Sequence, residues 1–182
     1  MPFPLETNCL LLRHFSDSDL NDFLAYRSDP QVARYQGWEI PYEVDVARAF
    51  VEEMKAATPG TPGKWFQAAI ELKSTKKLIG DCAFHIMAND ALQAFIGITL
   101  AKPYWGKGLG AETCQCLLNY LFGELHLHRV VAECDVENVA SFSLLERLGF
   151  RREAHLIENI WFKGAWCSEF HYAMLDREWK PK

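Results

Sequence analysis

The 182-residue sequence lacks the features of membrane, repeat, low-complexity and secreted proteins. It has no apolar run near the ~18–20 residues that a membrane-spanning helix needs. It also has no internal repeat and no low-complexity tract. Its first residues, MPFPLE, do not form a basic segment followed by an apolar stretch, which is the pattern of a secretory signal. We therefore expect one domain over residues 1–182, cytoplasmic and without a membrane partner.

A surplus of positive charge is also missing. The chain has 24 acidic and 19 basic side chains, which gives a formal net charge of −5. Proteins that bind the phosphate backbone are usually basic, so we expect no nucleic-acid partner. The composition, 49% hydrophobic and 24% charged, provides ample material for a core.

Neither the cysteines nor the histidines have the spacing of a metal or redox site. Cys114 and Cys116 are separated by one residue in a predicted helix, where the two side chains face different sides. His126 and His128 have no carboxylate or cysteine at ligand spacing nearby, and one of them is expected to cap the preceding helix. We expect reduced cysteines and no metal.

Hydrophobic periodicity predicts a single α/β domain. Alternating or short apolar runs predict strands over residues 7–13, 64–73, 78–87, 91–101, 128–135, 150–162 and 166–176. Helices are expected from residue 16, over 30–35, after residue 41, after the glycines near 108, and over 138–148. The strand–helix–strand crossover requires a parallel pair. The sheet should be mixed, mostly antiparallel, and flanked by helices.

The segment YWGKGLGA, residues 104–111, lies between a predicted strand and a predicted helix. Its alternating glycines allow a tight turn that exposes backbone N–H groups, and these suit a pyrophosphate beside Lys107. No Lys-Ser/Thr follows the last glycine, which excludes a Walker A loop. The mid-chain position after an antiparallel meander excludes a Rossmann dinucleotide site. A plain strand-to-helix turn is the remaining alternative.

The same segment resembles the acyl-CoA pyrophosphate loop of the GNAT acetyltransferases. Trp105 departs from the general loop pattern. The run Tyr-Trp-Gly-Lys-Gly that contains it is similar to the loop of the RimJ/RimL-like branch, which acetylates the N-termini of ribosomal proteins. Further segments resemble that branch in the same order along the chain: Leu10–Arg13, Asp29–Val32, Arg34-Tyr35, Asn138–Ser141, Leu148–Phe150 and Glu178-Trp179. The resemblance implies the single-domain GNAT (acyl-CoA N-acyltransferase) fold and an acetyl-CoA-dependent N-acetyltransferase that moves acetyl directly to an amine.

The resemblance also implies which residues bind CoA. Ile98 and Leu100 would offer backbone hydrogen bonds to the pantetheine arm, in the manner of an added strand. Asn138, which also suits a helix N-cap, would contact the same arm. Ser141 would help protonate the leaving thiolate, because Leu145 stands where many relatives have a tyrosine. The pyrophosphate loop would comprise Trp105, Gly106, Lys107, Gly108, Leu109, Gly110 and Ala111.

The sequence offers several candidates for the residues that contact the acceptor amine. Candidates for a base that deprotonates the amine are His85, Asp81 and Glu71, on the meander strands. Candidates for the pocket wall are the aromatic residues Tyr35, Trp38, Trp65 and Phe84. The acceptor is either a protein N-terminus or a small amine. Two other functions stay open, a CoA-binding module without chemistry and a nucleotide-binding regulator. Aromatic residues late in the chain suggest a homodimer.

Overall fold

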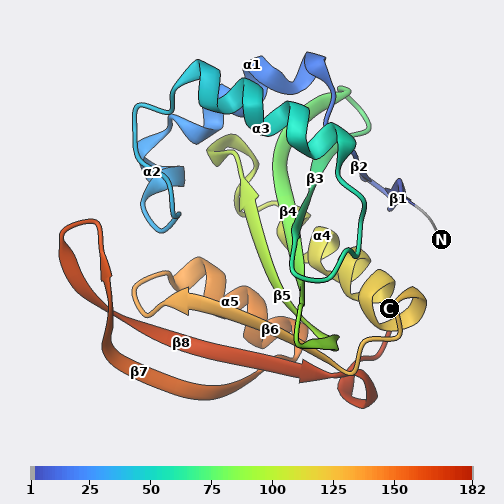
Figure 1. Cartoon of the computed structure of the whole chain (residues 1–182), viewed down its shortest axis with the longest axis vertical. Helices are drawn as coiled ribbons and strands as arrows, with labels where there is room; N and C mark the ends of the chain where they lie inside the picture. Colours follow the sequence, from blue (N-terminus) through green and yellow to red (C-terminus); the bar gives the residue numbers. More distant parts are fainter. Residues whose placement is uncertain (1–2, 182) are drawn as a thin grey trace.

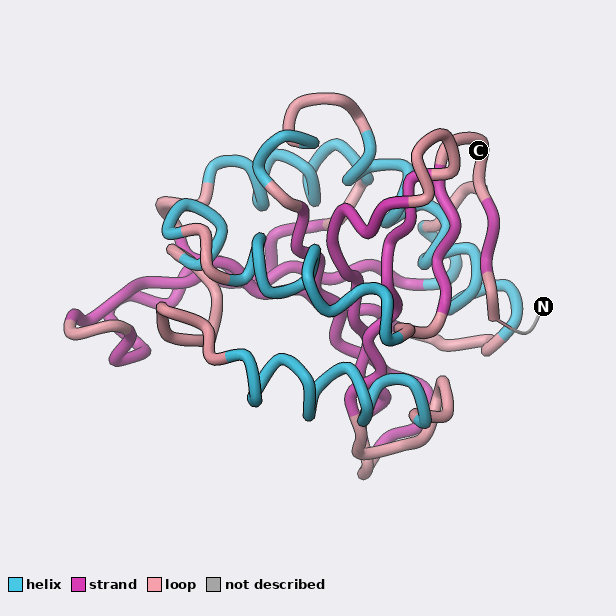
Figure 2. The backbone as a smooth tube through the Cα atoms, turned by 90° about the horizontal axis from the view of Figure 1, so that it is seen from above, coloured by secondary structure: helices cyan, strands magenta, loops and turns pink. Residues whose placement is uncertain are grey.

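The computed structural model describes residues 3–181, which form an eight-stranded sheet with helices on both sides (Figures 1 and 2). The strands are β1 (Leu5–Glu6), β2 (Leu10–Arg13), β3 (Trp65–Leu72), β4 (Lys77–Met87), β5 (Asp90–Leu100), β6 (Arg129–Asp135), β7 (Arg151–Phe162) and β8 (Ala165–Leu175). The α-helices are α1 (Leu20–Arg27), α2 (Pro30–Ala33), α3 (Val44–Ala56), α4 (Leu109–Leu118) and α5 (Val139–Leu148). Short helical turns are η1 (Asp17–Asp19), η2 (Lys102–Tyr104), η3 (Asn119–Glu124) and η4 (Asp176–Glu178).

The sheet has the order β1-β2-β3-β4-β5-β6-β8-β7. Every neighbouring pair is antiparallel except β5 and β6, which are joined by the crossover through α4. The mixed, mostly antiparallel sheet predicted from the sequence is therefore confirmed. Figure 1 shows β5 and β6 starting close together and then diverging, with the opening directed toward α2 and the turn of the β7–β8 hairpin.

Each face of the sheet packs against its own helices. On one face, α4 and α5 cover a core that includes Ile70, Phe84 and Leu118. On the other face, α1 and α3 bury a smaller cluster around Phe23 and Val51. Strand alternation separates the two layers, because neighbouring residues of one strand point to opposite faces. A residue's place in this alternation thus decides whether it belongs to the α4–α5 layer or to the α1–α3 layer.

Helix boundaries follow the capping signals in the sequence. Asp29 caps α2 by accepting from the Gln31 N–H at 2.8 Å, and Pro30 occupies the first helical position. Asn138 caps α5, and Gly149, at φ 96°, ends it in the left-handed conformation. At Ser16, where a helix was expected to begin, the Ser16 N–H donates to the Asp19 carboxylate at 2.7 Å, as in a capping box.

The segment after α1 reaches across the opening between β5 and β6. Tyr35 donates its hydroxyl to the Glu137 carbonyl at 3.2 Å, and Arg34 pairs with the Glu137 carboxylate at 3.0 Å. From the hairpin, Lys163 donates to the Ala33 carbonyl at 2.7 Å. The segment around α2 therefore contacts both the β6–α5 turn and the hairpin.

The β7–β8 hairpin carries an exposed aromatic pair. Trp161 and Trp166 are 60% and 58% exposed, and their ring centroids lie 5.6 Å apart. Exposed aromatic side chains are common at protein interfaces. The homodimer expected from these late aromatic residues stays a prediction.

Candidate functional site

The opening between β5 and β6 begins after three residue pairs. The last pair is Phe95 with Val131; beyond it both strands continue without pairing to each other. The Ala101 N–H donates to the Ile79 carbonyl of the β4 side at 2.8 Å. Because backbone groups alternate along a strand, those of Ile98 and Leu100 point the other way, into the opening. The structure thus places both predicted residues on an edge that can accept an added strand.

The glycine loop lies at the same end of β5. Gly106 and Gly108 have φ values of 70° and 80°, a region that side chains other than glycine rarely adopt. Gly108 is the N-cap of α4 and has no side chain to cap the helix. The first amides of α4 therefore have no partner within the helix and remain available to an anionic group.

Two side chains of the loop have contacts of their own. Trp105 is 45% exposed and donates its indole N–H to the Leu100 carbonyl at 2.7 Å. The exposed Lys107 ammonium lies 5.6 Å from the ring centroid of Tyr104. Trp105 therefore occupies a carbonyl that was expected to bind the pantetheine arm, whereas the exposed Lys107 ammonium is free to pair with a phosphate.

The remaining loop residues begin α4. Leu109 is buried, and Ala111 is half-buried in the first turn. A Cβ added to Gly110 would lie 3.6 Å from Leu144 on α5 and 3.7 Å from Leu100 on β5. Both are ordinary van der Waals distances, so α4, α5 and β5 meet around Gly110 without requiring glycine there.

The start of α5 faces the opening from the β6 side. The Asn138 Oδ1 accepts from the Ser141 N–H at 3.2 Å, so Asn138 is the helix cap. Ser141 is half-buried, and its hydroxyl is near enough to the thiol of Cys134 on β6 to lower the pKa of that thiol. Burial raises the pKa of Cys134 to about 11, despite the opposing effect of Ser141. A neutral thiol of this kind is a poor nucleophile, which disfavours an acyl-cysteine intermediate.

Asp81 is not placed to act as a base. It is 1% exposed, and its carboxylate accepts from the Tyr26 hydroxyl at 2.5 Å, the Arg27 guanidinium at 3.0 Å and the Gln67 amide at 2.9 Å. Three donors satisfy this carboxylate inside the protein, so it connects α1 to the sheet instead of facing a substrate. Burial, together with the negative charge of Asp81, raises the pKa of Tyr26 well above its ordinary value.

Two further candidates are also placed elsewhere. Glu71 accepts from the Arg13 guanidinium at 2.7 Å and is 8% exposed, so it is part of a buried ion pair between β2 and β3. Phe84 is 1% exposed and packs against Phe66 and Tyr120 in the α4–α5 layer. It lies on the opposite face of β4 from His85, because the two residues are neighbours in one strand.

Four predicted residues lie on or near the α1 face. His85 is half-buried, and its ring centroid lies 5.2 Å from that of Trp65, its cross-strand partner. Trp38 donates to the Arg27 carbonyl at 2.9 Å, and its ring lies 3.7 Å from the Arg27 guanidinium carbon. Tyr35 belongs to the segment that reaches across the opening. The structure thus brings His85 and Trp65 together and places Trp38 over Arg27.

Glu133 was not predicted from the sequence. It lies on β6 two residues beyond Val131, so it is the first residue on this face after the strands diverge, and it is exposed. Its cross-strand partner on β8 is His171, whose Nδ1 is 3.6 Å from the Glu133 carboxylate. The sequence did contain a signal for it, because Glu133 is a charged residue inside the apolar run from 130 to 134. Strand alternation places it on the other face of the sheet from the buried Ala132 and Cys134.

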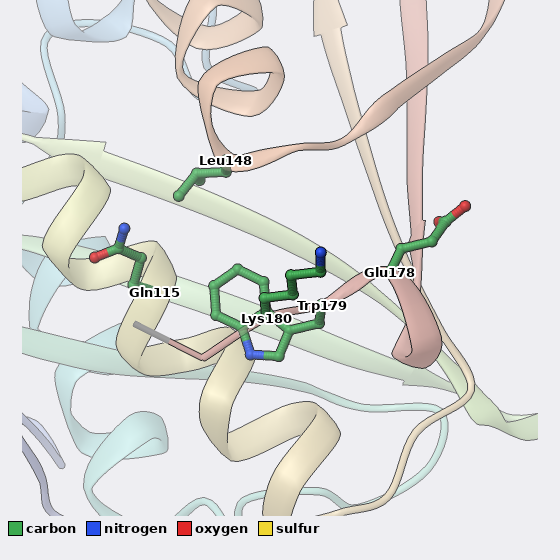
Figure 3. Close-up of a pocket in the computed structure, with 5 residues that line it drawn as sticks. All are labelled: Gln115, Leu148, Glu178, Trp179 and Lys180. Carbon is green, nitrogen blue, oxygen red and sulfur yellow. The ribbon is translucent and has the colours of Figure 1, made fainter.

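A small cavity lies away from these groups. It has a volume of about 200 Å³ and is lined by Gln115 of α4, Leu148 of α5 and the segment Glu178–Lys180 (Figure 3). None of its lining residues belongs to the glycine loop or to the β5–β6 opening. Among residues 3–181, no group of three or more metal-ligating side chains comes together, and no helix is long and apolar enough to cross a bilayer.

Comparison with known proteins identifies the family. A profile described as "Acetyltransferase (GNAT) domain" matches residues 10–151. The chain belongs to the GNAT acetyltransferase family. It is 31% identical over 175 residues to the N-acetyltransferase p20 of Bacillus licheniformis, whose function is uncharacterised, covering 96% of this chain and 97% of that one. The structure of a GNAT-family acetyltransferase from Bacillus anthracis matches with a TM-score of 0.86 and 28% identity, over 97% of this chain and 100% of the other.

The match to the branch that acetylates ribosomal proteins is partial. The [ribosomal protein uS5]-alanine N-acetyltransferase of Escherichia coli is 28% identical over 107 residues, 58% of this chain and 55% of that enzyme. The family assignment makes this GNAT protein an N-acetyltransferase with acetyl-CoA as the donor. Since the matched relatives carry the names of enzymes, nothing supports the alternative of a CoA-binding module without chemistry.

The first testable prediction separates CoA binding at the loop from backbone strain. Gly108→Ala and Gly164→Ala both place a side chain at positive φ, 80° and 87°, where an added Cβ meets no atom within 4 Å. Each variant should lose about 1–2 kcal/mol of stability. Only Gly108→Ala should also lose CoA affinity, by tenfold or more in calorimetry, because Gly108 begins the anion-binding turn. Equal CoA affinity in the two variants would contradict the loop assignment.

The second prediction concerns Asp81. Asp81→Asn leaves the Arg27 guanidinium buried without a counter-ion, so the free energy of unfolding should fall by about 3–5 kcal/mol. Below its lowered melting temperature, the variant should retain near-normal kcat. The control is Asp17→Asn, which removes an exposed ion pair with Lys55 and should not change the melting temperature. A large loss of kcat in Asp81→Asn without destabilisation would restore Asp81 as a catalytic candidate.

Proposed function

We propose that this N-acetyltransferase moves the acetyl group directly from acetyl-CoA to an acceptor amine that enters from the α1 face at the β5–β6 opening. The observation that carries the proposal is the convergence of three features at one edge of the sheet. The backbone of Ile98 and Leu100, the N-terminus of α4 and the N-terminus of α5 all meet there. A donor bound along β5 would have its pyrophosphate at the glycine loop.

In this arrangement the backbone of β5 holds the donor. Ile98 and Leu100 provide N–H and C=O groups for the pantetheine amides, in the manner of an added strand. For the Leu100 carbonyl, the donor competes with the Trp105 indole, which already donates to it at 2.7 Å. A backbone N–H of the Ile98 region stabilises the oxyanion that forms on the thioester carbonyl. Lys107 neutralises charge on a phosphate, and Asn138 shapes the start of α5 beside the pantetheine arm.

Ser141 is the group proposed to assist the leaving thiolate. It lies in the first turn of α5, whose N-terminus faces the opening, and its hydroxyl is near enough to the Cys134 thiol to lower the pKa of that thiol. Thiolate departure needs modest help, because an ordinary thiol has a pKa of about 8.5. A hydrogen bond that strengthens as charge builds on sulfur raises kcat more than it tightens acetyl-CoA binding.

Glu133 replaces Asp81 as the proposed base. Its carboxylate is exposed on the face where the acceptor enters, whereas the Asp81 carboxylate is satisfied by three buried donors. The base has a light task if the acceptor is an α-amino group, whose pKa of about 7.7–8.0 leaves part of it neutral at physiological pH. His85, on the same face, is the second candidate.

The acceptor is proposed to be a protein N-terminus or a small amine, with the N-terminus favoured. The resemblance to the RimJ/RimL-like branch extends along most of the sequence, and the partial match to the uS5-alanine enzyme agrees with it. Thiol release from acetyl-CoA, measured over a panel of N-terminal peptides, polyamines and aminoglycosides, tests the function. No thiol release above the rate without an acceptor, for any amine, would contradict it.

A third prediction tests Ser141. Ser141→Ala should lower kcat by roughly 10–100-fold with little change in the KM for acetyl-CoA, because the lost interaction forms mainly in the transition state. Ser143→Ala, on the same helix, serves as the matched control and should keep its kcat. Steady-state rates and melting temperatures are measured for both variants. A Ser141→Ala enzyme that reacts at the wild-type rate would remove Ser141 from the mechanism.

A fourth prediction tests Glu133. Glu133→Gln should lower kcat by roughly 100-fold at neutral pH, within the range usual for general-base catalysis. The deficit should shrink as the pH rises past the pKa of the acceptor amine, because the free amine then needs no base. Glu53→Gln on the exposed face of α3 is the charge-matched control. If the loss of kcat in Glu133→Gln stays constant with pH, or if kcat is not lowered at all, the general base is His85 or another group.

A further inference from the structure

Gly97 lies in the middle of β5, where its backbone conformation does not require glycine. Its φ is outside the left-handed range that favours glycine, unlike that of Gly106 or Gly108. Glycine inside a strand is destabilising, because it loses more conformational freedom on folding than other residues and packs no side chain. A glycine at this place therefore needs another reason.

Packing does not supply that reason. A Cβ added to Gly97 would meet no atom within 4 Å, and the residue is exposed. Gly80, in the neighbouring strand β4, is the opposite case, since a Cβ there would lie 2.1 Å from the Thr99 carbonyl oxygen. The space beside Gly97 is open in the folded protein, so a side chain would extend into this space and not into a neighbour.

The open space lies where the two strands diverge. Gly97 is two residues beyond Phe95, the last residue of β5 that pairs with β6. If the pairing continued, its partner would be Glu133, which is likewise two residues beyond Val131. Ile96 and Ile98 pack into the α4–α5 layer, so alternation directs Gly97 toward the opposite face. On this face its neighbour in β4 is Ala83.

A polar group stands one strand further on. Gln67 is the cross-strand partner of Ala83, and its amide nitrogen donates to the Asp81 carboxylate at 2.9 Å. This bond fixes which end of the carboxamide is the donor and leaves its oxygen as an acceptor. On this face the bare backbone of Gly97 thus lies between Gln67, two strands away on β3, and Glu133 across the opening. Both groups accept hydrogen bonds from an amine.

We propose that Gly97 determines which acceptors fit, because its missing side chain leaves room for a substituent on the amine-bearing carbon. The inference rests on the proposed function, which puts the acetyl group at the adjacent edge of β5. An unbranched alkylamine is slender at that carbon and needs little room. An α-branched amine, such as the N-terminal residue of a peptide, carries a substituent that needs the space. The enzyme should therefore accept α-branched amines, and a side chain at residue 97 should select against them.

The test combines kinetics with a binding assay that needs no turnover. In Gly97→Ala, kcat/KM for an alanyl peptide should fall tenfold or more, and in Gly97→Val a hundredfold or more. The KM for acetyl-CoA should stay within twofold of the wild-type value. In calorimetry, CoA whose sulfur is joined through an acetamide link to an alanyl peptide should bind the wild type at least tenfold more tightly than CoA. Gly97→Val should lose that advantage and keep its affinity for CoA.

The control is Gly123→Ala, at a second glycine that has no positive φ and no atom within 4 Å of an added Cβ. It should leave both measurements unchanged. The melting temperature of Gly97→Val should not fall, because valine suits a strand, and this separates the proposed role from a structural one. Two results would overturn this inference but leave the proposed function standing. One is a wild-type enzyme that accepts unbranched amines but rejects α-branched ones. The other is equal affinity of the wild type and Gly97→Val for the CoA–peptide conjugate while both still bind CoA. Failure of the wild type to bind CoA would overturn the proposed function with it.

Discussion

The divergence of β5 and β6 is the constraint on which the rest of this structure depends. These strands form the single parallel pair among the described residues, and parallel strands end at the same edge of a sheet. Each is followed by a helix, so the N-termini of α4 and α5 meet at the opening. Helix N-termini present free N–H groups and favour negative charge. One topological feature thus gives the site both an unpaired strand edge for an extended ligand and an electropositive end for a phosphate.

Opening a sheet exposes backbone groups that pairing would satisfy, and the chain compensates with local contacts. Trp105 donates to the Leu100 carbonyl from the glycine loop. Tyr35 and Lys163 connect the segment around α2 to the two structures on the far side, the β6–α5 turn and the hairpin. These contacts are few and mostly exposed, which is typical of elements that rearrange when a ligand binds. The buried contacts, in contrast, lie beneath α1, where Arg27 and Asp81 fix the helix to the sheet.

Much of the fold and the donor side of the site follows from the sequence, because periodicity, caps and the glycine loop are local signals. The acceptor side depends on register between strands distant in sequence, which no local pattern gives. Glu133 and Gly97 face each other across the opening because they stand at matching positions, each two residues beyond the last β5–β6 pair, Phe95 with Val131. One error was avoidable: Phe84 and His85 are consecutive in a strand, so they cannot both face the acceptor. The placement of Asp81 required the structure, since its partners Tyr26 and Arg27 come from a helix more than fifty residues away.

The two carboxylates on this face show how surroundings assign different tasks to similar groups. Asp81 and Glu133 both come from strands and both point away from the α4–α5 layer. Asp81 is enclosed beneath α1 and accepts hydrogen bonds from three donors, so its carboxylate stabilises the fold. Glu133 stands where the sheet has opened, with the His171 Nδ1 3.6 Å from its carboxylate. The divergence that creates the proposed donor site therefore also keeps one carboxylate exposed. The buried carboxylate, in turn, holds the Gln67 amide on the same face of the sheet, two strands from Gly97.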